Sequence, residues 1–124
     1  MKISIHQPMY IPWIPYFMKV AHSDVFVFFD DVQYPRSKNY INRNIIKSVH
    51  GPLMLTVSIK GRSKLIKIKD IEIDNSNDWQ RKHWKSIYLN YKKAKYFKKY
   101  QSVFEEYYLG KSCLHISEFN ISII

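Results

Sequence analysis

Residues 3–31 read ISIHQPMYIPWIPYFMKVAHSDVFVFFDD, and this stretch decides the fold. Residues 2–6 alternate polar and apolar side chains, which predicts a short strand. Prolines exclude regular structure in residues 7–13, whereas Pro15 suits the first turn of a helix. Residues 25–29 are apolar without interruption, which predicts a strand buried on both faces of a parallel sheet. This order of elements predicts a βαβ unit with a right-handed crossover.

A third strand and a break follow along the chain. Residues 53–59 are predominantly apolar and β-branched, which predicts a strand. Between residues 65 and 73 the alternation of apolar side chains shifts by one position around Asp70. Such a shift indicates a bulge or a break at that point.

The C-terminal half predicts a long helical region. Residues 77–109 contain no Gly or Pro, and their apolar side chains recur at spacings of three and four or their sums. This pattern predicts one amphipathic helix, or two with a break, ended by Gly110. Near its start we expect Trp79, His83 and Trp84 to seat the helix on a sheet. The expected fold class is α/β, with a partly parallel sheet and a long C-terminal amphipathic helical region.

Length and composition limit the classes of protein. The chain has 124 residues and a net charge of +10, and its 46% hydrophobic residues exclude wholesale disorder. We expect a single domain over residues 1–124. The only cysteine, Cys113, excludes a disulfide framework within the chain and is expected to be a core thiol. No apolar run approaches the roughly 18–20 residues of a membrane span and no secretory signal is present, so a cytoplasmic location is expected.

Candidate catalytic residues follow the first two predicted strands. His6 ends the first strand, and Asp30, Asp31 and Gln33 follow the second. Because the carboxyl ends of parallel strands meet at one edge, we expect these side chains to share a cleft. An imidazole with two carboxylates suits acid–base chemistry, or a phosphate chelated to a metal such as Mg²⁺. The residues are equally compatible with Asp30 or Asp31 capping a turn and His6 bonding to the proline loop.

Two basic segments are candidates for anion binding. Asn42, Arg43 and Asn44 form a polar cluster around a planar cation, which favours recognition of phosphate or carboxylate over a purely structural role. Residues 92–99 carry five lysines opposite the apolar stripe. Such a lysine face is typical of a solvated helix surface, with contact to nucleic-acid phosphates as the alternative.

The motifs resemble one family in order and over nearly the whole chain. HQPMYIPW (residues 6–13), DDVQ (residues 30–33) and NRN (residues 42–44) are similar to the signature blocks of the WbqC-like family. That family occurs in bacterial gene clusters that build O-antigen and related surface polysaccharides. From this setting we hypothesise a role on a nucleotide-activated sugar, as a candidate transferase. Its members are longer, so the chain is expected to be the N-terminal part of a WbqC-like domain.

Under this hypothesis each motif residue receives a role. His6 contacts a phosphate or acts as an acid, Arg43 holds the anion, and Asp30 or Asp31 holds a metal or a sugar hydroxyl. The remaining candidates line the ligand site: Gln7, Tyr10, Trp13, Gln33, Asn42 and Asn44. Two alternatives stay open, namely a basic nucleic-acid-binding module and a non-catalytic partner or truncated fragment. In the latter, the isoleucine-rich residues 117–124 would be an interface without a partner in this chain.

Overall fold

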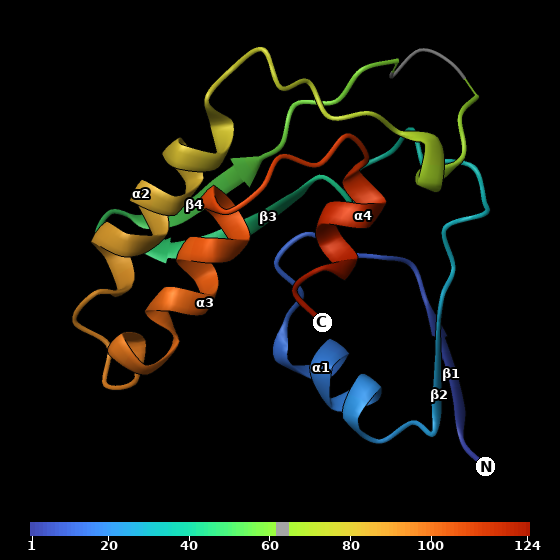
Figure 1. Cartoon of the computed structure of the whole chain (residues 1–124), viewed down its shortest axis with the longest axis horizontal. Helices are drawn as coiled ribbons and strands as arrows, with labels where there is room; N and C mark the ends of the chain where they lie inside the picture. Colours follow the sequence, from blue (N-terminus) through green and yellow to red (C-terminus); the bar gives the residue numbers. More distant parts are fainter. Residues whose placement is uncertain (62–64) are drawn as a thin grey trace.

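The N-terminal βαβ unit forms as predicted. The structure is a computed structural model and describes residues 1–61 and 65–124. Strands β1 (Ile3–His6) and β2 (Val25–Phe28) pair in parallel and are connected by α1 (Ile14–Ala21) (Figure 1). The carboxyl ends of both strands therefore meet at one edge of this small sheet, where the proline loop begins.

β2 is covered on one face only, so the prediction of a strand buried on both faces is wrong. Phe26 packs against Tyr16 of α1, with 5.5 Å between the ring centroids. Two strands joined by one crossover helix have a single face under that helix. The alternate side chains are exposed, namely Ile3, Ile5, Val25, Val27 and Phe29.

The second sheet is an antiparallel hairpin that the sequence predicts only in part. β3 (Arg43–Ser48) pairs with β4 (Gly51–Thr56). Gly51 follows the turn with φ 106°, a conformation that glycine adopts without steric cost. The strand predicted at residues 53–59 therefore begins earlier and ends at Thr56. Arg43 and Asn44 of the polar cluster begin β3, where they pair with Thr56 and Leu55 of β4.

Two helices cover this hairpin. The helical region divides into α2 (Trp79–Tyr91) and α3 (Phe97–Leu109), which confirms the prediction of a break, and Gly110 caps α3 as expected. The Tyr91 hydroxyl accepts a hydrogen bond from the backbone N–H of Lys47 in β3, at 2.9 Å. None of the helices in the described part of the chain has the length and apolar character needed to cross a membrane.

The segment between the hairpin and α2 contains the predicted break. A 3₁₀ turn, η1 (Ile68–Asp70), lies where the alternation shifts. On its two sides, Gln33 forms an isolated bridge with Lys67, and Ile59 forms one with Ile73. The break thus lets residues on both sides of η1 pair with different parts of the chain.

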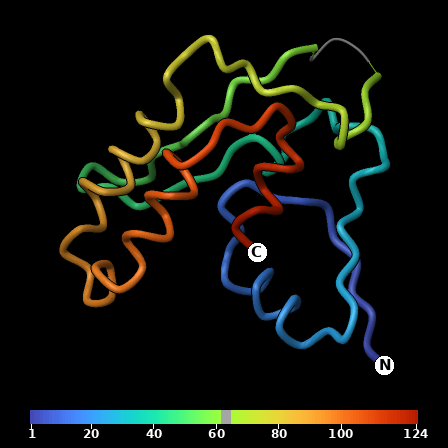
Figure 2. Tube along the Cα trace, in the orientation of Figure 1, coloured from blue at the N-terminus to red at the C-terminus, as the bar shows by residue number. Residues whose placement is uncertain are grey.

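The last helix, α4 (Ile116–Ile121), lies at the centre of the molecule (Figures 1 and 2). Phe119 is fully buried and Ile121 and Ile123 are half-buried, whereas Ile124 is 40% exposed, so the apolar end expected at residues 117–124 is packed into the core except at its last residue. Asn120 Nδ2 donates to the carbonyl of Ile41 at 2.7 Å, and Ser117 Oγ donates to the Asp30 carboxylate. The short helix therefore connects the end of β2 to the segment before β3.

A chain of hydrogen bonds runs through the core. Tyr10 is fully buried, and its hydroxyl lies 2.6 Å from His83 Nδ1 and 2.8 Å from the Tyr108 hydroxyl. Tyr10 therefore links α2, through His83, with α3, through Tyr108. Trp79, His83 and Trp84 are all buried, which confirms that they seat α2, and Cys113 is the predicted core thiol.

Two neighbouring tyrosines give a matched test of this network. The Tyr107 hydroxyl is buried and has no hydrogen-bond partner among the described residues, whereas the Tyr108 hydroxyl is hydrogen-bonded to that of Tyr10. We expect Tyr108→Phe to lower the free energy of unfolding by about 1 kcal/mol. Tyr107→Phe should leave it unchanged or raise it, because an unsatisfied polar group is removed. Urea unfolding of both variants measures the difference, and equal destabilisation would contradict the assignment.

Candidate functional site

The proline loop after β1 is held in an unusual conformation. Ile11 has φ 45°, in the left-handed region that β-branched residues avoid. Asn44 Nδ2 donates to the carbonyls of Tyr10 at 3.0 Å and of Ile11 at 2.8 Å. The Tyr10 backbone N–H donates to the carbonyl of Tyr40 at 2.9 Å. The loop is thus anchored to the segment that leads into β3, and the strained residue is fixed between two side-chain bonds.

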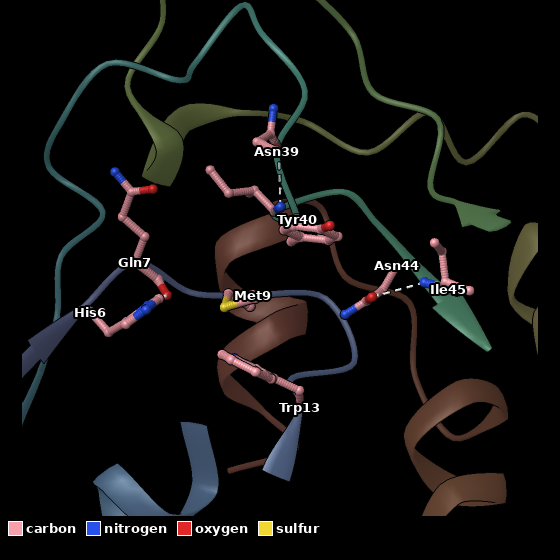
Figure 3. A pocket seen from close by; sticks show the side chains of 9 residues that line it. His6, Gln7, Met9, Trp13, Asn39, Tyr40, Asn44 and Ile45 are labelled. Carbon is pink, nitrogen blue, oxygen red and sulfur yellow. Dashed lines mark hydrogen bonds between the residues drawn. The ribbon is translucent and has the colours of Figure 1, made fainter. Parts of the chain in front are cut away.

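A pocket of about 550 Å³ lies between this loop and the segment that leads into β3, within the roughly 300–1,000 Å³ typical of small-molecule sites. We call it the His6 pocket. Figure 3 shows side chains of the loop facing those of residues 39–45. Its lining combines imidazole and amide groups with aromatic and apolar walls: His6, Gln7, Met9, Trp13, Asn39, Tyr40, Ile41, Asn44 and Ile45.

The hydrogen bonding of His6 defines its tautomer. Nδ1 lies 2.9 Å from the carbonyl oxygen of Gln7. A carbonyl can only accept, so Nδ1 carries the proton in the neutral ring and Nε2 keeps its lone pair. Tyr16 meets the imidazole edge-on at 4.9 Å between ring centroids, which fixes the orientation of the ring. His6 therefore offers a proton acceptor from a side chain that two neighbours hold in place.

A second, basic pocket of about 530 Å³ adjoins the first at Asn39, which lines both. Three cationic side chains line it: Arg36, Lys38 and Arg43. Arg43 Nε donates to the carbonyl of Asn39 at 3.1 Å, which leaves its terminal nitrogens available as donors. No acidic residue is in its lining. The arrangement suits an anion such as phosphate.

Two predicted ligand residues lie in the core rather than in either pocket. Tyr10 belongs to the hydrogen-bond chain with His83. Asn42 is almost fully buried, where its Oδ1 accepts from the Tyr34 hydroxyl at 2.8 Å and its Nδ2 donates to the carbonyl of Val57 at 2.9 Å. Neither side chain lines a pocket, and both support the pocket walls from the core.

The carboxylates predicted beside His6 have other partners. Asp31 accepts from Lys67 at 2.8 Å and lies 2.7 Å from Lys69, and these two lysines hold the pKa of its carboxyl at about 2. Asp30 accepts from Ser117 in α4. Gln33 is exposed and joins Lys67 through a backbone bridge. None of these three predicted residues lines the His6 pocket.

The structure thus brings together four of the predicted residues and adds others. His6, Gln7, Trp13 and Asn44 share one pocket, and Arg43 lines the adjoining one. The other five lining residues of the His6 pocket were not predicted as site residues: Met9, Asn39, Tyr40, Ile41 and Ile45. Met9 lies inside the HQP motif, and Tyr40 is an aromatic residue within a polar loop. Their places next to predicted site residues were the only sequence signal that could have identified them. No group of three or more His, Cys, Asp or Glu side chains in residues 1–61 and 65–124 is arranged to hold a metal ion.

Comparison with known proteins places these features in a family. The model of the WbqC-like protein family matches residues 7–124. The chain is similar to the uncharacterized protein Rv1507c of Mycobacterium tuberculosis (strain ATCC 25618 / H37Rv), with 36% identity over 121 residues. The match covers 96% of this chain and 51% of that protein, so the chain spans about half the length of this curated relative. No solved structure matches the chain. The family match includes every lining residue of the two pockets except His6, together with the core that supports them: the chain belongs to the WbqC-like protein family.

Proposed function

We propose that the His6 pocket and the basic pocket together bind a nucleotide-activated sugar, used in the assembly of bacterial surface polysaccharide such as O-antigen. The observation that carries the proposal is the junction of the two pockets at Asn39. One pocket offers amide, imidazole and aromatic groups, and the other offers three cations. A sugar joined to a diphosphate presents the complementary sequence of groups, hydroxyls on a ring followed by negative charge.

The roles follow from the chemistry of each pocket. The sugar ring packs against Trp13, whose side chain is 63% exposed and so available to a ligand. Gln7 and Asn39 bond to hydroxyls, and the cations of the basic pocket neutralise the diphosphate. Asp30 and Asp31 receive no role in this proposal because Ser117 and the two lysines occupy them.

His6 is the candidate for proton transfer. Its Nε2 lone pair can take the proton of an acceptor hydroxyl while that oxygen bonds to the anomeric carbon. The bond from that carbon to the diphosphate oxygen then breaks, and the nucleoside diphosphate leaves with its electron pair, its charge stabilised by the basic pocket. The proposed transfer step therefore depends on the imidazole of His6 as the base.

Titration calorimetry with UDP-, GDP- and dTDP-sugars tests the binding proposal. We expect one of these classes to bind, and Arg36→Ala/Lys38→Ala to weaken it at least about tenfold through the loss of two charge-assisted contacts. Lys47→Ala/Lys85→Ala is the matched control, because it removes the same charge from exposed positions outside both pockets. It should change the affinity less than about twofold.

Two results would sink the proposal. One is the absence of saturable binding for every sugar nucleotide. The other is an equal loss of affinity in both double variants, which would indicate attraction by net charge alone. Thermal unfolding of each variant verifies that the fold is retained, so that a loss of binding refers to the pocket.

A further inference from the structure

Residues 92–99, which comprise the connection between α2 and α3 and the start of α3, are rich in lysine, and we call them the lysine-rich connection. Its five lysines, all exposed, are Lys92, Lys93, Lys95, Lys98 and Lys99. The sequence has no acidic residue between Asp78 and Glu105, so this charge is not compensated along the chain. Among the residues that the structure describes, none of the five forms an ion pair. The connection is therefore a concentrated positive surface.

An apolar groove of about 520 Å³ lies against the same connection. Trp13 and Phe17 come from the N-terminal side of α1, and Lys95, Tyr96 and Tyr100 come from the connection and the start of α3. The floor is aliphatic and aromatic, with Ile11, Ile45, Ile87 and Phe104 among its lining residues. Apolar side chains thus line both sides of the groove, and the lysines lie next to one of these sides.

Cation–π contacts tie the charges to the edge of the groove. The Lys95 ammonium lies 5.1 Å from the centroid of the Tyr96 ring, and that of Lys99 lies 5.4 Å from Tyr100. Tyr96 is 61% exposed and Tyr100 49%. The positive groups therefore border the aromatic rings that an occupant of the groove would touch.

The facing helix presents exposed aliphatic side chains as well. Ile14 is 76% exposed and Met18 53%, and both lie on α1 beside Trp13 and Phe17. On a surface that binds nucleic acid, exposed aromatic side chains stack on bases and cationic side chains bind phosphates. Exposed aliphatic side chains have no such partner in a nucleic acid. Lysines that border Trp, Tyr and aliphatic side chains are instead typical of surfaces that lie at the headgroup level of a bilayer.

We propose that this surface docks on an anionic membrane, with the lysines of the connection on lipid headgroups and the groove and outer side of α1 at the acyl boundary. Charge complementarity selects anionic lipids, because each lysine near such a surface strengthens binding about fivefold. The groove shares Trp13, Asn44 and Ile45 with the His6 pocket. Lys95 and Lys99 line neither the His6 pocket nor the basic pocket, so variants of these two lysines test membrane docking separately from sugar-nucleotide binding.

Co-sedimentation with vesicles tests the proposal. We expect the protein to bind vesicles of phosphatidylcholine with phosphatidylglycerol and to leave pure phosphatidylcholine vesicles largely unbound. Lys95→Glu/Lys99→Glu should reduce the partition coefficient at least about thirtyfold, the product of two lysines. Lys82→Glu/Lys85→Glu is the matched control, because it changes the net charge equally at exposed positions of α2 outside the groove.

Tryptophan emission gives a second readout. Trp79 and Trp84 are buried and Trp13 is exposed, so a blue shift on adding vesicles reports Trp13 entering a less polar environment. We expect this shift to disappear in Trp13→Phe while sedimentation persists. Equal losses in the two lysine variants, or binding to a mixed-sequence oligonucleotide with no vesicle binding and no blue shift, would overturn the proposal.

Discussion

Replacing Phe119 with alanine should lower the free energy of unfolding by about 3–5 kcal/mol, the largest single effect that we expect. The side chain is fully buried in α4. Its ring centroid lies 4.3 Å from that of Tyr107 and 5.1 Å from that of Trp79. It also packs against Tyr10, which belongs to the hydrogen-bond chain of the core. Truncation leaves a cavity that this rigid aromatic cluster cannot close.

Leu114→Ala is the matched control for this experiment. Leu114 lies just before α4 and is 52% exposed, so its truncation removes a side chain of comparable apolar character without opening a cavity. We expect a loss below about 1 kcal/mol. Urea unfolding at one temperature compares the two variants. Similar small losses in both would show that α4 is not part of the cooperative core.

Stability should fall by about 3 kcal/mol as the pH is lowered from 6.5 towards about 4, because of one residue, His83. Burial lowers the pKa of His83 from 6.5 to about 4. In this range the unfolded chain binds a proton at His83 that the folded protein does not bind. Stability therefore rises with pH across the window and is fully present above pH 6.5.

His83→Gln isolates this contribution. Glutamine retains a hydrogen-bond acceptor for Tyr10 but does not titrate, so the variant is expected to lose most of the slope between pH 6.5 and about 4. Unfolding titrations across this window measure the slope in both proteins. Asp31 does not interfere, because the lysine partners that lower its carboxyl pKa to about 2 place its contribution at lower pH. An unchanged slope in His83→Gln would rule out His83 as the source.

Local sequence signals predicted the elements that depend on local chemistry. The alternation of residues 2–6 predicted β1, Pro15 in the first turn predicted α1, and the apolar run at residues 25–29 predicted β2. Gly110 marked the end of α3, and the change of alternation at Asp70 marked η1. In each case the deciding signal is a backbone preference or a periodicity that acts within a few residues.

Long-range contacts account for what the sequence left unpredicted. The apolar run of β2 does not reveal how many strands join the sheet, so its exposed face was missed. Asn42 and Asn44 have the composition of a loop, but Tyr34, Val57 and the proline loop satisfy their side chains. The segment forming α4 is short and has no pronounced pattern, and its burial depends on the aromatic core around it.

Of the candidate site too, only part was predictable from local sequence signals. The HQP motif and Arg43 indicated a ligand site, and the structure places His6, Gln7, Trp13 and Asn44 around one pocket with Arg43 in the next. The shared edge of the parallel strands did not bring the carboxylates into that lining. Asp30 and Asp31 follow β2 directly, but α4 and the segment at Lys67 draw them to other partners.

The central claim is that the two adjoining pockets hold one nucleotide-activated sugar, and a nuclear magnetic resonance titration tests it most directly. Amide spectra of the ¹⁵N-labelled protein would be followed during addition of the sugar nucleotide that binds best. We predict saturable shifts that begin together at residues 6–13 and 36–45 and leave residues 92–100 unchanged. Shifts confined to the lysine-rich connection, or no saturable shift at either pocket, would contradict the account.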